Sequence, residues 1–209
     1  MRHHWLNRAD NDKLIMFFGG WSFDHKPFEV LECEDYDVVM FYDYNDISTI
    51  QPFNYSTVQL IAWSMGVFIA YLLKDKLPQF ERKIAINGTP FPVDDEFGIP
   101  KKVFDLTLAH ARTGLEGKFY KNVMGADFER FSCERSVDNC VEELHSLSKI
   151  VRNPSYEPFY DLAIIGAQDK IVPTKNQINF WQGRTPYELL ETGHFPFYNY
   201  TRWSEMLCK

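Results

Sequence analysis

The sequence predicts an α/β fold in which a compact, mostly parallel sheet is flanked by helices. Short apolar segments that end in turn residues alternate with helical segments over most of the chain, which is typical of parallel strands joined by crossover helices. One stretch, about 98–152, instead has helical periodicity and no clear strand. We therefore expect a single domain over 1–209, with this stretch inserted between two strands as a helical lid.

The expected elements follow the apolar pattern in chain order. Strands are predicted at 3–7, 13–18, 37–42, 57–62, 82–87, 160–166 and 186–190. Helices are predicted at 65–75, 174–181 and 199–207. In the insertion, one helical stripe contains Val137, Val141, Leu144 and Val151, and a weaker one contains Val103, Leu106 and His110. The alternative for this stretch is a plain layer of packing helices.

Composition and charge exclude several classes of protein. The chain has 209 residues, of which 45% are hydrophobic, so it can form one full core and is neither disordered nor fibrous. Its formal net charge of −7 argues against nucleic acid as a general partner. No apolar run reaches the length of a membrane span, and the first residues lack the apolar stretch of a signal peptide. We therefore expect a cytoplasmic protein.

The cysteines offer no sign of a metal site. Cys33, Cys133, Cys140 and Cys208 match no zinc-binding spacing. A cytoplasmic setting disfavours disulfides, so we expect free thiols in the core. The prediction accordingly includes no metal and no cofactor.

The most informative segment is 59–67, where an apolar, strand-like run ends abruptly at Ser64. The apolar residues after Gly66 can continue as a buried helix. A sharp strand-to-helix turn exposes its central residue and places that side-chain oxygen near a helix N-terminus. Such a turn needs small residues on both sides, and Ala62 and Gly66 provide them. We interpret Ser64 as a nucleophile, and the alternative is a serine that caps an ordinary helix.

Two further polar residues follow predicted strands. Asp169 comes just after the strand at 160–166, at the edge of the sheet where open α/β folds hold their sites. His194 lies between a glycine and aromatic residues, after the last predicted strand. The alternative for Asp169 is a helix cap, although Pro173-Thr174 is a better helix start.

The chain order Ser64, Asp169, His194 is that of the catalytic triads of α/β-hydrolases. A serine hydroxyl needs a base to remove its proton, which is the role expected of His194. Asp169 would hold the imidazole in the required tautomer and stabilise its cation. If Asp169 does not do so, Asp161 and Glu191 are the other candidates.

An oxyanion hole requires backbone N–H groups beside the nucleophile. Met65, directly after Ser64, is one predicted donor. The other is Trp21, which follows the glycine pair at the end of the strand at 13–18. We also expect the Trp21 indole to form one wall of the pocket. The alternative is a Gly-Gly turn with no catalytic part.

With these residues, the chain resembles the α/β-hydrolases and, more closely, the compact BioG-type esterases of bacterial biotin synthesis. The segments that carry the resemblance are Phe17-Phe18-Gly19-Gly20-Trp21, Phe41-Tyr42-Asp43-Tyr44, Ala62-Trp63-Ser64-Met65-Gly66, Ile86-Asn87-Gly88-Thr89-Pro90 and Gly193-His194. The Trp-Ser-Met-Gly element also occurs in BioH-type esterases. The short N-terminus, and Phe-Gly-Gly-Trp in place of a His-Gly pair, favour the BioG type.

The resemblance implies hydrolysis of the methyl ester of pimeloyl-[acyl-carrier protein], with pimeloyl-[acyl-carrier protein] and methanol as products. Ser64 would then attack the ester carbonyl, and His194 would act first as base and then as acid. Asp169 would orient His194, while the amides of Trp21 and Met65 would hold the oxyanion. The implied partner is an acyl-carrier protein that bears the ester.

Residues that contact the substrate and the carrier are predicted on weaker patterns. The apolar acyl slot is assigned to Trp21, Trp63, Phe91, Phe195 and Phe197, although aromatic residues more often belong to a core. The carrier is acidic in this family, so binding would need a basic patch on the insertion. The candidates are Lys101, Lys102, Arg112, Lys118, Lys121, Arg130 and Arg135. Their alternative role is that of solvated helix charges.

Three other functions are compatible with the sequence. One is a broader carboxylesterase or acyl thioesterase with the same triad. A second is a non-catalytic binding protein on a hydrolase scaffold, although the intact Ser/Asp/His set argues against it. A third is a lyase or peroxidase of this fold, which uses the same residues without hydrolysing an ester.

Overall fold

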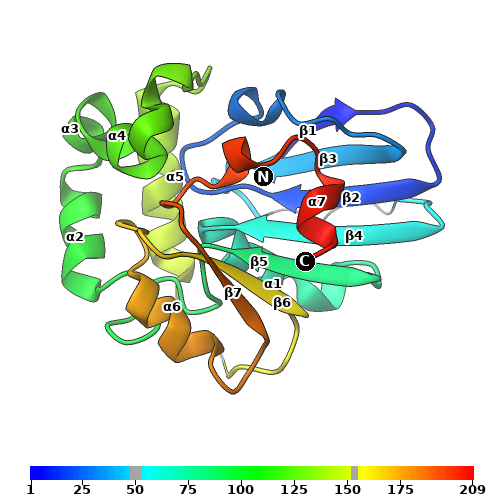
Figure 1. Ribbon diagram of the computed structural model, residues 1–209. Coiled ribbons are helices and arrows are strands. Elements are labelled where there is room, and N and C mark those ends of the chain that lie inside the picture. Colours follow the sequence, from blue (N-terminus) through cyan, green and yellow to red (C-terminus); the bar gives the residue numbers. More distant parts are fainter. Residues whose placement is uncertain (48–52, 152–154) are drawn as a thin grey trace.

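The computed structural model describes residues 1–47, 53–151 and 155–209 (Figure 1). Within them, one sheet contains in spatial order β1 (Arg2–Asn7), β3 (Tyr36–Tyr42), β2 (Lys13–Phe18), β4 (Thr57–Trp63), β5 (Arg82–Ile86), β6 (Leu162–Gly166) and β7 (Tyr187–Leu190). β1 pairs with β3 in antiparallel fashion, and the pairs from β3 through β7 are parallel. The predicted mostly parallel sheet is therefore confirmed, and each predicted strand overlaps an observed one.

Helices pack on both faces of this sheet. They are α1 (Met65–Leu72), α2 (Lys101–Ala109), α3 (Ala111–Glu116), α4 (Phe119–Met124), α5 (Val137–Ile150), α6 (Thr174–Trp181) and α7 (Ser204–Leu207). Apolar side chains of α1, α5 and α6 join the core on one face, and those of α7 join the core on the other. Figure 1 shows α1 and α7 on opposite sides of the sheet. β2, β3 and β4 are consequently buried over almost their whole length, as expected for strands that are covered on both faces.

The helical insertion lies between β5 and β6, where the sequence predicts it. Its helices α2 to α5 stand together at one end of the sheet (Figure 1). In α5, the predicted stripe faces the core, and Leu144 is buried in it. In α2, the predicted stripe is wrong, because Val103 and Leu106 are exposed while Phe104 is buried. The larger apolar surface of the phenylalanine decides which side of α2 packs inward.

The predicted helix at 199–207 is wrong in its first half, because α7 begins only at Ser204. The chain before it pairs with a distant segment. The Glu32 N–H donates to the Thr201 carbonyl at 2.9 Å, and the Trp203 N–H donates to the Glu32 carbonyl at 3.1 Å. These long-range backbone hydrogen bonds hold the segment extended, and a local apolar pattern carries no sign of them.

The cysteines are free thiols, as predicted, but they do not all belong to the core. Cys140 is buried, Cys33 and Cys133 are half-buried, and Cys208 is exposed. Burial raises the pKa of the Cys33 and Cys140 thiols to about 11 and that of Cys133 to about 12. Since the thiolate is the reactive form, these three thiols are expected to be unreactive near neutral pH.

Gly66 is predicted to be irreplaceable because α1 starts against the end of β2. A Cβ at this position would lie 2.2 Å from the Phe18 carbonyl oxygen and 2.6 Å from that of Gly19. Gly66→Ala should therefore destabilise the protein by about 3 kcal/mol, as overpacking against backbone does. Gly114→Ala is the matched control, because a Cβ there meets nothing within 4 Å. Thermal unfolding of both variants is the measurement, and equal melting temperatures would contradict the prediction.

Alkylation should distinguish the thiols. Iodoacetamide at pH 8 is expected to modify Cys208 in the native protein and to modify Cys33, Cys133 and Cys140 only after unfolding, because their pKa values are raised and the groups are covered. Peptide mass spectrometry of native and denatured samples measures this. Modification of Cys140 at the rate of Cys208 in the native protein would show that the core is open there.

Candidate active site

Ser64 occupies a strained turn between β4 and α1. Its φ and ψ angles are 56° and −124°, a region that non-glycine residues adopt only when their surroundings enforce it. The Ser64 N–H donates to the Ile86 carbonyl at 2.9 Å, which fastens the turn to the end of β5. The Ser64 side chain makes no capping hydrogen bond to α1. The alternative of a capping serine is therefore wrong, and the hydroxyl is directed elsewhere.

That hydroxyl belongs to a chain of hydrogen bonds through His194 to Asp169. Ser64 Oγ lies 2.8 Å from His194 Nε2, and His194 Nδ1 lies 2.8 Å from Asp169 Oδ2. His194 is 2% exposed and Asp169 is 7% exposed, so bulk water does not compete for the bond between them. The three residues come from the loops after β4, β6 and β7.

Further contacts of Asp169 determine which atoms donate and which accept in these hydrogen bonds. Asp169 Oδ1 accepts the N–H groups of Ile171 and Val172 at 2.8 and 3.0 Å, and Oδ2 accepts the Gln177 side-chain amide at 2.9 Å. Because both oxygens act as acceptors, His194 Nδ1 carries the proton. Nε2 is then left to accept the hydroxyl of Ser64.

The other two carboxylates considered from the sequence lie away from His194. Asp161 accepts the Lys83 N–H at 2.8 Å and pairs with the Lys83 ammonium at 2.9 Å. Glu191 is exposed. Asp169 is thus the carboxylate that the fold brings to the imidazole.

Asn87 holds the His194 loop, and sequence reasoning missed this role. Its side-chain amide donates to the carbonyls of Gly193 and His194 at 3.0 and 2.9 Å, and it accepts the Gly166 N–H at 2.6 Å. The Trp63 indole N–H donates to the same His194 carbonyl at 2.8 Å. The signal available in the sequence was an asparagine and a glycine directly after an apolar strand, and the structure shows that this asparagine is buried with φ of 47°.

Trp21 and Met65 lie where two amides can face a group bound at Ser64. Met65 is the first residue of α1, so its N–H has no acceptor within the helix. The loop that contains Trp21 packs on the nucleophile, since a Cβ at Gly20 would lie 3.2 Å from Ser64 Cβ. Over residues 1–47, 53–151 and 155–209, neither amide has a hydrogen-bond acceptor. Both N–H groups are therefore available to a ligand.

A cavity of about 200 Å³ opens at Ser64 and His194. Its walls are mostly apolar and come from the Trp21 loop, from α2, α4 and α5, and from the loop after β6. They comprise Trp21, Phe23, Trp63, Ser64, Met65, Ile99, Val103, Phe104, Thr107, Phe119, Asn122, Val123, Leu144, Lys170, Ile171 and His194. The insertion thus forms much of the wall opposite the nucleophile.

Two of the residues predicted for the acyl slot line this cavity, and three lie elsewhere. Trp21 and Trp63 are wall residues. Phe91 instead packs against Phe97 and Phe180, with ring centroids 5.9 and 5.3 Å apart. Phe195 and Phe197 are buried in the core, where both contact Phe28 and Trp63. These phenylalanines fill space between elements, and the aromatic residues that the insertion contributes to the cavity wall are Phe104 and Phe119.

The basic residues of the insertion divide into two groups. Of those predicted to contact the carrier, the exposed ones are Lys101, Lys102, Arg112, Lys118, Lys121 and Arg130. Arg135 is not, because its side chain is 2% exposed and pairs with Glu143 at 2.7 Å. As a surface contact for a carrier protein, Arg135 is therefore wrong. Lys170, which the sequence did not suggest, is exposed and lines the cavity.

Comparison with known proteins decides the family. A family model described as "Pimeloyl-ACP methyl esterase BioG" matches residues 1–206. The chain belongs to the BioG family. A crystal structure of BioG from Haemophilus influenzae is similar with a TM-score of 0.91 and 29% sequence identity, over 99% of this chain and 99% of that one.

Two more relatives extend the comparison. A lipase-esterase related protein from Clostridium acetobutylicum has a TM-score of 0.63 and 16% identity over 92% of this chain and 91% of its own, which shows the fold alone. Malonyl-[acyl-carrier protein] O-methyltransferase from Bacteroides fragilis is 34% identical over 177 residues. That match covers 80% of this chain, and the chain spans only 36% of that relative's length. The predicted BioG resemblance and α/β-hydrolase fold are confirmed, and the family supports a hydrolase of the esterase type.

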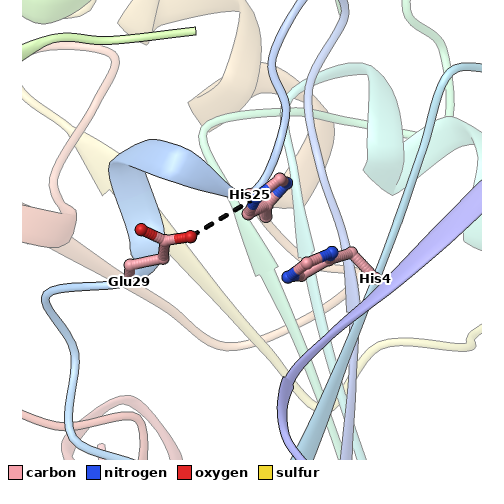
Figure 2. A group of neighbouring side chains, drawn as sticks. All are labelled: His4, His25 and Glu29. Atoms are coloured by element: carbon pink, nitrogen blue, oxygen red, sulfur yellow. Dashed lines mark ion pairs between the residues drawn. The ribbon is translucent and has the colours of Figure 1, made fainter. Parts of the chain in front are cut away.

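One group of side chains in this BioG-family chain has the composition of a metal site. In the described residues, the possible ligand atoms of His4, His25 and Glu29 all lie within 4.8 Å of one another (Figure 2). The two imidazoles stack with centroids 3.6 Å apart and planes 14° apart, so their in-plane lone pairs lie in parallel planes and do not meet at one ion. The Lys26 ammonium, 3.4 Å from Glu29, would also compete with a metal ion for that carboxylate. We assign no metal to this group, which lies outside the cavity.

Among the helices that the structure describes, none combines the length and the apolar character needed to cross a bilayer.

Proposed function

We propose that this protein is a serine esterase that hydrolyses the methyl ester of pimeloyl-[acyl-carrier protein] to pimeloyl-[acyl-carrier protein] and methanol. The observation that carries the proposal is the 2.8 Å contact between Ser64 Oγ and His194 Nε2 at an apolar cavity, in a chain of the BioG family. We further propose that residues 1–209 form one domain that acts in the cytoplasm, with 98–152 as its lid.

The first half of the reaction would form an acyl-enzyme. His194 Nε2 takes the proton of Ser64 as Oγ bonds to the ester carbonyl carbon, and Asp169 stabilises the resulting imidazolium. The negative charge that develops on the carbonyl oxygen is held by the N–H groups of Trp21 and Met65. The carbon–oxygen bond to the methoxy group then breaks, and His194 gives its proton to the leaving oxygen to form methanol.

Water would complete the cycle through the same groups. His194 takes a proton from water as its oxygen attacks the acyl carbon, and the two amides again hold the charge. When the bond to Ser64 Oγ breaks, His194 returns a proton to the serine, and the pimeloyl chain leaves as a carboxylic acid that then ionises in solvent. His194 carries each proton that moves at Ser64, at the leaving methoxy group and at the attacking water, so the steps need no metal or cofactor.

The walls of the cavity support an acyl chain as the ligand. A methyl ester at the end of a polymethylene chain is apolar, and its burial against residues such as Trp21, Phe104 and Phe119 is favourable by about 25 cal/mol per Å² of apolar surface. A folded carrier protein cannot enter about 200 Å³, so it would remain at the mouth while the chain enters.

The Bacteroides fragilis relative supports a methyl ester on a carrier protein. Its name describes methyl transfer to malonyl-[acyl-carrier protein], and part of its length is similar to this chain. An activity that removes a methyl group from a carrier-bound acyl chain would complement one that adds it.

Replacing the triad residues tests the proposal. Ser64→Ala should reduce hydrolysis of the pimeloyl methyl ester on the order of 10⁴-fold or more, because triad members act as a unit. Asp169→Asn should also cost activity heavily, because it disturbs the tautomer of His194. The measurement is methanol release from the carrier-bound ester, with fluorophosphonate labelling of Ser64 as a second readout.

The same assay separates the alternatives. A wild-type protein that cleaves short esters and acyl thioesters but not the pimeloyl ester would instead be a broader esterase. A protein that is folded, unlabelled by fluorophosphonate and inactive on all esters would be a binding protein on a hydrolase scaffold. Either result would overturn the proposed function.

Basic residues around the mouth are predicted to bind the carrier. Lys102, Lys118 and Lys121 are exposed, and each directly precedes a residue of the cavity wall without lining the cavity itself. Changing these three to glutamate should raise KM for the carrier-bound ester and leave kinetics on a small p-nitrophenyl ester unchanged, because only the carrier meets the surface.

The matched control is Lys76→Glu, at the opposite end of α1 from Ser64. It makes the same change of charge as each of the three single replacements, on an exposed side chain, and should leave both substrates unaffected. Equal losses on the two substrates, or an equal effect of Lys76→Glu, would contradict carrier binding at the mouth.

A further inference from the structure

A buried carboxylate on α5 contacts the loops after β2 and β3, of which the first packs on the nucleophile. Glu143 is 0% exposed. Its Oε2 accepts the Ser22 N–H at 3.1 Å, and its Oε1 accepts the Tyr44 N–H at 2.7 Å. Ser22 follows β2 and Tyr44 follows β3, so one side chain of the insertion bridges the ends of two neighbouring strands.

Both loops are strained where Glu143 holds them. Ser22 has φ of 69°, and Asp43, which precedes Tyr44, has φ of 56°. Non-glycine residues keep such angles when other contacts enforce them, at a cost of about 1–3 kcal/mol each. Glu143 accepts the N–H of the strained residue Ser22 and the N–H of Tyr44, the residue that follows the strained Asp43.

Arg135 balances the charge of Glu143. Its Nη1 donates to Glu143 Oε2 at 2.7 Å, and its Nη2 lies 3.5 Å from Asp43 Oδ1. Asn139 accepts two further N–H groups of the guanidinium, at 2.8 and 2.9 Å. A carboxylate can therefore be buried beside these loops without an unpaired charge.

Hydrogen bonds hold the backbone on both sides of the Trp21 amide. After it, the Ser22 N–H is held by Glu143, and the Ser22 carbonyl accepts the Tyr120 hydroxyl at 3.3 Å. Before it, the Gly19 carbonyl accepts the Tyr44 hydroxyl at 2.8 Å. Burial raises the pKa of Tyr44 well above its usual value, so this hydroxyl remains a donor. The Trp21 side chain is held separately, because its indole donates to the Cys140 carbonyl at 2.8 Å.

We infer that Glu143 is a positioning residue that sets the direction of the Trp21 N–H in the oxyanion hole. Glu143 holds Ser22 directly through its N–H. It holds Gly19 indirectly, because it binds Tyr44, whose hydroxyl donates to the Gly19 carbonyl. The Trp21 N–H lies between these two held residues and is left free for the substrate. The inference rests on the proposed function, because only in ester hydrolysis does the Trp21 N–H have an oxyanion to bind. It also makes α5, which belongs to the proposed lid, a fixed part of the site.

Glu143→Gln tests the inference with little change of volume. The amide has one acceptor oxygen, so it cannot accept both N–H groups and pair with Arg135. We expect kcat on a p-nitrophenyl ester and on the pimeloyl methyl ester to fall about 10- to 100-fold, approaching the loss of an oxyanion donor. KM should stay within about twofold, because the cavity walls are unchanged. Glu142→Gln, an exposed neighbour on α5, is the matched control and should behave as the wild type.

A trifluoromethyl ketone supplies a readout that a purely structural role would not move. Its adduct with Ser64 carries an oxyanion, so its inhibition constant should rise by the same factor as kcat/KM falls in Glu143→Gln. A fall in activity that tracks only the folded fraction in thermal unfolding, with an unchanged inhibition constant for the folded protein, would overturn the positioning role.

The double variant Arg135→Met/Glu143→Met addresses folding. Replacing a buried ion pair by apolar side chains is often neutral for stability, but here it removes the acceptor of both N–H groups. A stable double variant with reduced kcat supports the inference, and one with wild-type kcat overturns it. A wild type that is inactive on every ester contradicts the proposed function as well. An active wild type with an unaffected Glu143→Gln contradicts the positioning role alone.

Discussion

The close packing of the Ser64 turn between the ends of β2 and β5 is the constraint on which the site depends. α1 starts so near β2 that no side chain fits at Gly66, and a Cβ at Gly88 would lie 2.5 Å from the Ser64 carbonyl oxygen. The turn is therefore held in its strained conformation by backbone on two sides. Because of this conformation, the Ser64 hydroxyl does not cap α1 and instead lies within hydrogen-bond distance of His194 Nε2.

Around that turn, buried polar side chains keep the neighbouring loops in register with it. Asn87 fastens the His194 loop to β5 and β6, and Gln177 fastens Asp169. Glu143 does the same for the loops after β2 and β3. Each of these groups is buried with its hydrogen bonds to the loops made, so the loops cannot move without leaving a polar group unpaired. The sheet places the loops of the site next to one another, and these buried side chains fix how each loop is oriented.

The predictions from sequence succeeded where the signal is local. Strand ends and the sharp turn at Ser64 are properties of short segments, and the fold brings Ser64, Asp169 and His194 together as their chain order indicates. They failed where a distant partner decides. Arg135 resembles a solvated helix charge until Glu143 is placed beside it, and Phe91 and Phe195 resemble pocket residues until their aromatic neighbours are known.

The sequence by itself determined the alternation of strands and helices, the place of the insertion and the identity of the hydrogen-bonded serine, aspartate and histidine, because periodicity and turn chemistry act over a few residues. Tertiary structure alone decided which side of α2 is buried, where α7 begins, and that Glu143 reaches Ser22 across 121 residues of chain. Those outcomes depend on contacts between segments that are remote in sequence. Such contacts form, and stabilise the protein, only after the sheet has brought the segments together.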